Sequence, residues 1–243
     1  MSAARPSVRE TLYVKRSERL SPHYRRIVLR GDGVERFADV TPGAHYKIFV
    51  PSGTTRVRRT YTHRHFDAAA RELWIDFALH DAPGPAAAWA ARACAGDPLE
   101  VAVKLGRKAL VPAAASYVLV ADLSALAVTA TLLESMPSSA HATVVIAVHG
   151  PEDELSLRSL ATTHIEWVHG AAHVVDRLRA LRLPAEQRFA HIAGELRLVR
   201  DVRAHLQGAR GWHRDELHAN SYWKSHATED ESSDERRADH DGG

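Results

Sequence analysis

The pattern of hydrophobic and polar positions changes near residue 112. Before it, short stretches rich in β-branched and aromatic residues are separated by turn signals such as Thr41-Pro42-Gly43. Strands are predicted over 11–20, 24–31, 45–51, 58–65, 73–79 and 99–103. Such short strands favour a small antiparallel β-barrel, because closing the sheet removes its exposed edges. A helix over 85–94 is expected before the last strand, since Gly84-Pro85 is a helix-start signal.

After Pro112, continuous apolar strands alternate with helical stretches. Strands are predicted over 116–122, 142–150, 165–170 and 189–195, and helices over 124–136, 173–182 and 196–208. This alternation predicts a parallel sheet covered on both faces, with ligands at the carboxyl ends of the strands. Ala121-Asp122, Gly150 and Gly194-Glu195 fall at those ends.

The predicted fold class is therefore two-domain β plus α/β. An antiparallel β-barrel over 1–112 precedes a small doubly wound parallel-sheet domain over 113–227. The cleft between them is the expected active site. Residues 228–243 hold seven acids, two arginines and little apolar content, so this tail is expected to be disordered.

Composition and charge narrow the function classes. A hydrophobic content of 45% with 26% charged residues is ordinary for a soluble protein. The formal net charge of +2 combines −5 on the tail with +7 on the remainder, which attracts anionic nucleotides or acidic chelates without requiring nucleic acid. We expect no export signal and no membrane span, because the chain shows no charged-then-apolar leader and no sufficiently long apolar run. The single Cys94 is expected to be a small buried hydrophobe in the helix, and it fits a reducing cytoplasm.

The first candidate for chemistry is the segment RRTYTHRHFD, residues 58–67. In an extended segment Arg59 and Tyr61 share a face, and Thr62 offers its hydroxyl and backbone beside them. A guanidinium can hold a phosphate, a phenol ring can lie against an aromatic system, and a hydroxyl can reach a polar ring edge. The set suits a flavin nucleotide; an edge strand with solvated arginines is the alternative.

The second candidate is the segment 73–90, where a strand runs into Gly84-Pro85 and an alanine-rich helix. Small residues in the first turn let a ligand approach unpaired backbone amides, whose dipole favours a phosphate. The segment is a candidate pyrophosphate site, and a tight turn into a buried helix is the alternative.

The order and spacing of several short motifs carry further information. They are Arg59-Thr60-Tyr61-Thr62, Arg64, Asp67, His80, Gly84-Pro85-Ala86, Trp89-Ala90 and Gly96-Asp97. Together they resemble the siderophore-interacting proteins, a branch of the ferredoxin reductase-like flavoproteins. Segments 45–51, 193–196 and 221–224 also resemble family landmarks. The resemblance implies an FAD-binding barrel followed by an NAD(P)-binding-like domain.

The same resemblance implies a function in iron acquisition, as an FAD-dependent oxidoreductase of the ferric-chelate reductase type. Electrons from NAD(P)H or a ferredoxin-like donor would pass through FAD to the Fe(III) of a ferric siderophore and release the iron. A flavin suits this task because a nicotinamide delivers two electrons whereas ferric iron accepts one. No catalytic side chain and no protein-bound metal is implied.

The resemblance also assigns roles to residues. Arg59 would pair with the flavin phosphates, Tyr61 would pack beside the isoalloxazine, and Thr62 would hydrogen-bond near its redox-active nitrogen. The remaining expected cofactor-binding positions are Thr60, His80, Gly84, Pro85, Ala86, Ala87 and Trp89. Lys47 and Lys224 match basic positions that would meet an anionic siderophore, and a solvated surface charge is the alternative for each.

The turn at residues 121–130 departs from the family pattern. It keeps Asp122 but lacks the glutamate, the threonine and the proline that relatives usually carry there, although Ser124 keeps a hydroxyl. Because relatives would receive a nicotinamide nucleotide at this turn, a second hypothesis is a non-catalytic or degenerate flavoprotein or siderophore-binding module. The aromatic pair Tyr222-Trp223 could flank the flavin or cap the core of the second domain.

The chain contains 16 histidines, which raises the question of a metal site. His63 and His65 share a strand face, and His164, His169 and His173 are close in sequence. The sequence has no HExxH motif and no Cys/His quartet, so neither a structural nor a catalytic zinc is expected.

Overall fold

The computed structural model describes residues 7–80, 83–105 and 110–225. The chain divides into two compact units, residues 1–110 and 111–243. The tail that is expected to be disordered, 228–243, lies outside the described residues. No helix within the described ranges is long and apolar enough to cross a membrane.

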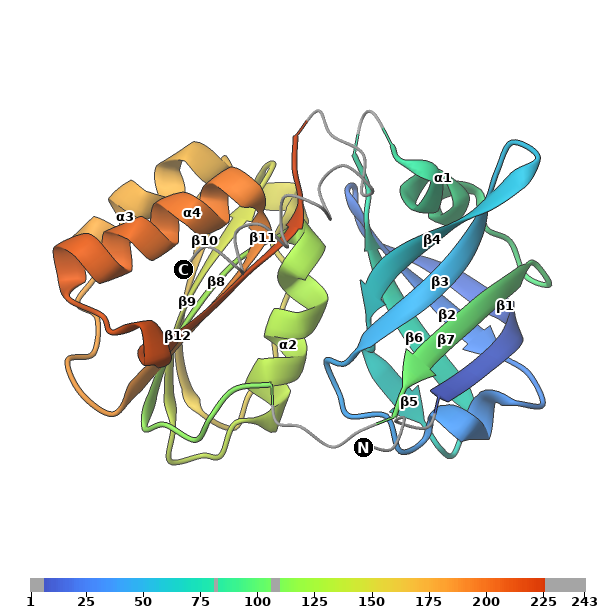
Figure 1. The fold of residues 1–243 in the computed structure, drawn as a ribbon, viewed down its shortest axis with the longest axis horizontal. Helices are drawn as coiled ribbons and strands as arrows, with labels where there is room; N and C mark the ends of the chain where they lie inside the picture. Colours follow the sequence, from blue (N-terminus) through green and yellow to red (C-terminus); the bar gives the residue numbers. More distant parts are fainter. Residues whose placement is uncertain (1–6, 81–82, 106–109, 226–243) are drawn as a thin grey trace, which may run out of the picture. The chain divides into compact units, whose positions relative to one another are not determined.

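The first unit is an antiparallel sheet that curves into a barrel (Figure 1). Its elements are β1 (Ser7–Ser21), β2 (Tyr24–Arg30), η1 (Val34–Phe37), β3 (His45–Ser52), β4 (Thr55–Thr62), β5 (His65–Asp67), β6 (Glu72–Ala78), α1 (Pro85–Arg92) and β7 (Pro98–Lys104). The strand order is β4-β3-β7-β1-β2-β6-β5, and β4 also approaches β6. On β3, Tyr46, Ile48 and Val50 are buried with the period of two that a strand with one core-facing side requires.

The described part of the barrel has one strand more than the sequence predicts. The predicted strand 58–65 is in fact two strands, β4 and β5, because the chain changes its pairing partner at His63. The His63 amide donates to Ala44 O at 2.7 Å, beside β3, and the Arg64 amide donates to Trp74 O at 3.2 Å in β6. This change of partner carries the chain from one end of the sheet to the other and helps to close the barrel.

The second unit is a parallel five-stranded sheet in the order β10-β9-β8-β11-β12. Its strands are β8 (Ser116–Asp122), β9 (His141–Val148), β10 (Thr162–His169), β11 (Arg188–Glu195) and β12 (Leu217–Trp223). Its helical elements are η2 (Leu123–Ala125), α2 (Leu126–Ser135), η3 (Pro151–Asp153), η4 (Ala171–His173), α3 (Val174–Ala180), α4 (Leu196–Ala204), the π-helix η5 (His205–Ala209) and η6 (Arg214–Glu216). Helix α2 covers one face, and α3 and α4 cover the other (Figure 1).

The strand order of this sheet reverses between β8 and β11. The chain runs from β8 outward through β9 and β10, then returns to the opposite side of β8 to form β11 and β12. In such sheets, ligands bind outside the carboxyl ends of the strands at the reversal, the topological switch point. Asp122 and Glu195 are the last residues of β8 and β11, as the sequence predicts. Edge strand β12 is not predicted, because its half-buried, mixed sequence has no apolar run.

One sequence-based expectation is wrong. Cys94 is exposed and lies beyond α1, which ends at Arg92. Ala93 has the extended dihedral ψ 128°, so the chain has already left the helix. The Cys94 amide then donates to Asp97 Oδ2 at 2.8 Å, which fixes the turn and leaves the cysteine at the surface.

Candidate functional site

The motif on β4 divides between two faces of the strand. Arg59 and Tyr61 lie opposite the buried Ile48 and Tyr46 of β3, so they share the face that turns toward the core. Both are half-buried. The Arg59 Nη1 donates to the backbone oxygen of Arg58 at 2.8 Å, which bends the guanidinium back along the strand.

The opposite face of β4 carries a different pair. Thr60 lies opposite Lys47, and Lys47 Nζ donates to Thr60 Oγ1 at 2.5 Å in an exposed position. The structure thus brings Lys47 and Thr60 together, on the side of the sheet away from Arg59 and Tyr61. His80 is half-buried, just beyond the end of β6.

A row of aromatic rings connects β4 to α1. The Tyr61 ring lies 4.3 Å from the Phe77 ring, centroid to centroid, and the Phe77 ring lies 5.9 Å from that of Trp89. Phe77 and Trp89 are buried, whereas Tyr61 keeps part of its surface exposed. Trp89 therefore belongs to the core, from which it supports Phe77 and, through it, Tyr61.

The residues that follow Tyr61 are held by a buried hydrogen bond. Thr62 is 5% exposed and His63 is 2% exposed. The Tyr46 hydroxyl lies 2.5 Å from His63 Nδ1, and the backbone oxygen of His63 accepts from the Gly43 amide at 3.0 Å. Burial lowers the pKa of His63 to about 4, with smaller contributions from His65 and Arg64, so the ring is neutral at pH 7. The sequence analysis considered His63 only as a possible metal ligand and rejected that role, and no local signal revealed its bond to Tyr46.

Arg64 has a structural role in this unit. Its Nε lies 3.7 Å from Asp76 Oδ2, while Arg26 holds the same carboxylate through Nε at 2.7 Å and Nη2 at 2.8 Å. Asp76 is buried, so the two arginines compensate its charge.

The start of α1 is open to a ligand. Gly84 is the N-cap in an extended conformation, Pro85 occupies the first helical position, and no described side chain caps the helix. A Cβ at Gly84 would meet no described atom within 4 Å. Ala86 and Ala87 are buried, and the first turn contains no acid. Its first amides are therefore available to an anion, which the helix dipole also favours.

These features fit the cofactor that the sequence predicts. FAD presents a pyrophosphate, a flat ring system and polar ring edges, and the first unit offers a guanidinium, a half-exposed phenol ring, a hydroxyl and an uncapped helix start. These groups come from β4 and α1, which the aromatic row joins within one compact unit.

The helix starts at the switch point of the second unit have the opposite character. Asp122 Oδ1 accepts from Ser124 N at 2.8 Å and from Ser124 Oγ at 2.5 Å, which caps η2. Glu195 Oε2 accepts from Arg197 N at 2.5 Å and from Leu198 N at 3.2 Å, which caps α4. Carboxylates of the chain therefore occupy the positions where a dinucleotide phosphate would bind.

Trp223 is fixed to the carboxyl end of β8. Its Nε1 donates to Asp122 Oδ2 at 3.0 Å, across 101 residues of sequence. Of the two alternatives for the Tyr222-Trp223 pair, this bond favours a structural cap on the second unit. Lys224 follows directly and is half-buried.

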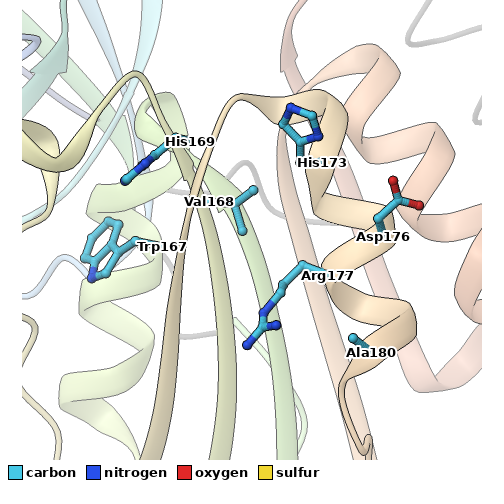
Figure 2. Close-up of a pocket in the computed structure, with 7 residues that line it drawn as sticks. All are labelled: Trp167, Val168, His169, His173, Asp176, Arg177 and Ala180. Atoms are coloured by element: carbon cyan, nitrogen blue, oxygen red, sulfur yellow. The ribbon is translucent and has the colours of Figure 1, made fainter.

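The second unit also contains an open cavity of about 470 Å³, between β10 and α3 (Figure 2). Its lining residues are Trp167, Val168, His169, His173, Asp176, Arg177 and Ala180. Acids pair with basic groups around it, since Arg177 Nη2 donates to Glu166 Oε1 at 2.5 Å and His169 Nε2 lies 2.9 Å from Glu154 Oε1. The lining thus mixes both signs of charge and does not select an anion or a cation.

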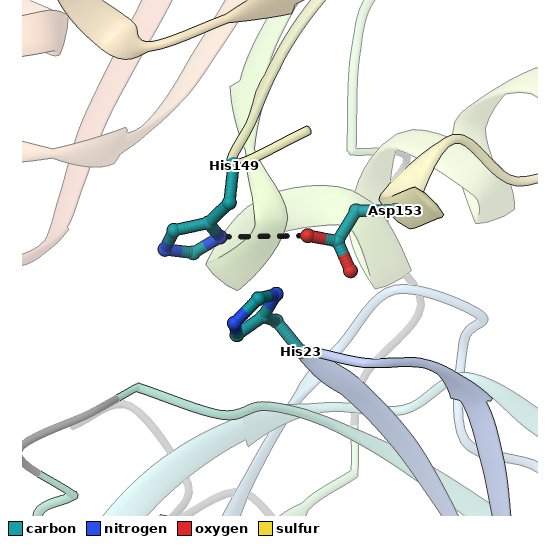
Figure 3. Close-up of side chains that lie close together, drawn as sticks. All are labelled: His23, His149 and Asp153. Atoms are coloured by element: carbon teal, nitrogen blue, oxygen red, sulfur yellow. Dashed lines mark ion pairs between the residues drawn. The ribbon is translucent and has the colours of Figure 1, made fainter. Parts of the chain in front are cut away.

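Other histidines of this unit also lie beside acids. His164 Nε2 lies 2.8 Å from Glu166 Oε1. His149 Nδ1 lies 3.6 Å from the buried Asp153 Oδ2 (Figure 3). Of the three histidines that are close in sequence, His169 and His173 line the same open cavity, whereas His164 and His169 lie beside different acids, Glu166 and Glu154.

Comparisons with known proteins agree with this geometry. Residues 114–226 match the family model of siderophore-interacting proteins, and residues 13–58 and 50–104 match the siderophore-interacting FAD-binding domain. The crystal structure of the siderophore-interacting protein SipS from Aeromonas hydrophila has a TM-score of 0.85 and 30% identity, covering 96% of this chain and 98% of that chain.

Similar sequences include two named reductases. The ferric vibriobactin reductase ViuB of Vibrio cholerae is 29% identical over 247 residues, covering 91% of each chain. The NADPH-dependent ferric-chelate reductase of Escherichia coli is 30% identical over 236 residues, covering 87% of this chain and 91% of the relative. The chain spans 66% of the length of uncharacterized Mycobacterium tuberculosis relatives that are 34% identical to it.

These findings confirm the predicted fold class, and the FAD-binding domain confirms the predicted cofactor, FAD. The chain belongs to the siderophore-interacting protein family.

Proposed function

We propose that this protein reduces ferric siderophores and releases their iron, with FAD in the first unit and electrons from NAD(P)H or a ferredoxin-like donor. The family and its FAD-binding domain support the predicted class, an FAD-dependent oxidoreductase. The reductase names of the V. cholerae and E. coli relatives support the substrate class. We propose the cytoplasm as the compartment, on the ground of the single cysteine.

The observation that carries this proposal is the start of α1. It has no described side-chain cap, no acid in its first turn and open space at Gly84. Arg59 and Tyr61 belong to the same unit and share a strand face. We assign the pyrophosphate to the α1 amides and Arg59, and the ring system to Tyr61 and Thr62.

When bound, FAD supplies the means to pass electrons singly to iron. The chain's own residues bind and orient it: Arg59 and the α1 amides neutralise phosphate charge, and the buried His63–Tyr46 bond fixes the backbone beside Thr62. His80 and Pro85 complete the proposed surroundings together with the backbone of Thr60, whose side chain lies on the opposite strand face beside Lys47. Ala86, Ala87 and Trp89 support them from the buried side. Lys47 and Lys224 supply positive charge for an anionic siderophore. Iron leaves after reduction because oxygen donors hold Fe(II) less strongly than Fe(III).

Anaerobic absorbance of the purified, FAD-loaded protein tests the proposal. The flavin band should bleach on addition of NADH, NADPH or reduced ferredoxin and return when a ferric siderophore is added. The donor that bleaches the band at the higher rate identifies the electron source. Reduced flavin that a panel of ferric siderophores fails to reoxidise would contradict the proposal.

A second candidate function has its own supporting observation. Carboxylates of Asp122 and Glu195 cap the helix starts at the switch point, where a nicotinamide nucleotide would place its phosphates. This favours a flavoprotein or siderophore-binding module that has lost its nicotinamide site. Protein that dithionite reduces, but that NADH, NADPH and ferredoxin all leave oxidised, would support this alternative.

A further inference from the structure

Lys224 lies between two residues that are each hydrogen-bonded to the last residue of a strand of the parallel sheet. On one side, Trp223 Nε1 donates to Asp122 Oδ2 at 3.0 Å. On the other, the Ser225 amide donates to Glu195 Oε1 at 3.3 Å. The backbone of Lys224 is therefore fixed on both sides, although β12 is an edge strand and the residue lies beyond its end.

Asp122 is the centre of this arrangement. The residue is 9% exposed, and its carboxylate accepts four hydrogen bonds. Two come from Ser124 to Oδ1, and two reach Oδ2, from the amide of Glu195 at 2.7 Å and from Trp223. One side chain thus connects the end of β8, the start of α4 and the end of β12. A buried carboxylate with this many donors is held in a single orientation.

Gly194 makes the close approach of Asp122 possible. Its φ is +145°, and a Cβ there would lie 2.7 Å from the Asp122 carboxyl carbon and 2.8 and 3.0 Å from its oxygens. A side chain at this position would displace the carboxylate.

The register of β12 directs Trp223 toward Asp122. Gly194 pairs with Ser221 and Glu195 pairs with Trp223, so Tyr222 is an extra residue on the edge strand. A bulge of this kind turns the following side chain to a new direction. Here the bulge brings the indole N–H of Trp223 to the carboxylate of Asp122.

We infer that Asp122 and Trp223 are positioning residues, which hold Lys224 where an anionic ferric siderophore binds. The inference rests on the proposed function for the role of Lys224. Neither residue touches the siderophore. Loss of the Trp223 bond would remove one of the two attachments beside Lys224 and loosen the end of an edge strand, and a lysine on a loosened end loses more conformational entropy on binding.

The test uses the full-length, FAD-loaded protein and two gallium(III) complexes, which have six oxygen donors but cannot be reduced. Tris(catecholato)gallium carries three negative charges, and tris(maltolato)gallium is neutral. Calorimetry gives Kd for each complex with wild type, Lys224→Ala, Trp223→Phe, Asp122→Asn and the double variant Trp223→Phe/Lys224→Ala. Trp223→Phe keeps an aromatic ring and removes only the N–H donor.

We expect Trp223→Phe and Asp122→Asn to weaken binding of the anionic complex about tenfold, toward the value of Lys224→Ala. Binding of the neutral complex should change little. The double variant should bind no more weakly than Lys224→Ala, because both changes remove the same interaction.

Trp212→Phe is the matched control. Trp212 is a buried tryptophan of the same unit whose Nε1 has no hydrogen-bond partner among the described residues. The same chemical change there should leave both Kd values at their wild-type level. Circular dichroism and the melting temperature verify that each variant is folded.

Several results would overturn the inference. These are wild-type Kd values for Trp223→Phe, equal weakening of both complexes, additive losses in the double variant, or an unaltered Kd for Lys224→Ala. The reductase proposal is tested separately with the iron complexes of the same ligands. Intact charge-selective binding without reduction would refute the reductase function and leave the positioning role standing.

Discussion

The Tyr61 ring packs against the ring of Phe77 at an interplanar angle of 37°. Tyr61 remains partly exposed, whereas Phe77 is completely buried. The core thus fixes one face of a surface ring, and a fixed ring can stack on a ligand with little loss of conformational freedom.

This relationship predicts how substitutions at Tyr61 affect the flavin. Tyr61→Ala should weaken FAD binding by about two- to tenfold, because an aromatic contact contributes about 0.5–1.5 kcal/mol. Tyr61→Phe keeps the ring and should bind nearly as wild type. Titration of FAD fluorescence measures the affinity of both variants. An equal loss of FAD affinity in the two would show that the Tyr61 ring does not stack on the flavin.

Arg59 is expected to contribute more than Tyr61. Arg59→Ala should lower FAD affinity by roughly one to two decades, since a charge-assisted contact is worth about 1.5–3 kcal/mol. Arg58→Ala is the control, because Arg58 is the exposed neighbour on the other strand face. If both variants lose the same affinity, the effect is one of net charge and the phosphate role of Arg59 is wrong.

The open start of α1 predicts opposite effects on stability and cofactor binding. Gly84→Asp should cap the helix and leave the FAD-free protein as stable as wild type, or more stable by a few tenths of a kcal/mol. The added carboxylate should nevertheless weaken FAD binding at least about fivefold, by occupying and repelling the phosphate position. Gly84→Asn caps without charge, so it separates the two effects. Unchanged FAD affinity in Gly84→Asp would place the phosphates elsewhere.

His63 predicts a stability change in mildly acidic solution. Its pKa is lowered from 6.5 to about 4 in the folded protein, so between these values the unfolded chain binds the extra proton. The stability contribution of the neutral ring is complete above pH 6.5 and falls by about 1.4 kcal/mol per pH unit as the pH drops toward 4.

Urea unfolding of wild type and His63→Gln between pH 7 and pH 4.5 measures this slope. The glutamine keeps a hydrogen-bonding group for Tyr46 but does not titrate. The variant should therefore lose less stability than wild type over the interval. If the unfolding free energies of the two proteins fall equally with pH, a group other than His63 causes the loss of stability.

The parts of the site that the sequence predicted are those set by local rules. The period of two placed Arg59 and Tyr61 on one face of β4, and Gly84-Pro85 marked the first turn of α1. The carboxyl ends of β8 and β11 were also predicted, because buried parallel strands have a continuous apolar pattern.

The parts that the sequence missed depend on tertiary contacts. The bond between Trp223 and Asp122 joins positions 101 residues apart, and no local pattern encodes it. The split of one predicted strand into β4 and β5 depends on which neighbour the amides of His63 and Arg64 find. The exposure of Cys94 follows from a helix that ends two residues earlier than the alanine-rich composition suggests.

The helix starts of the two units differ in what they offer to a phosphate. The carboxylates of Asp122 and Glu195 cap η2 and α4, whereas the first turn of α1 has no side-chain cap and no acid among the described residues. A nicotinamide nucleotide that donates electrons to the flavin would therefore place its phosphates away from these two capped helix starts. Neutralising either acid should raise the affinity of that helix start for a free dinucleotide, because a negative charge is removed beside the phosphate position.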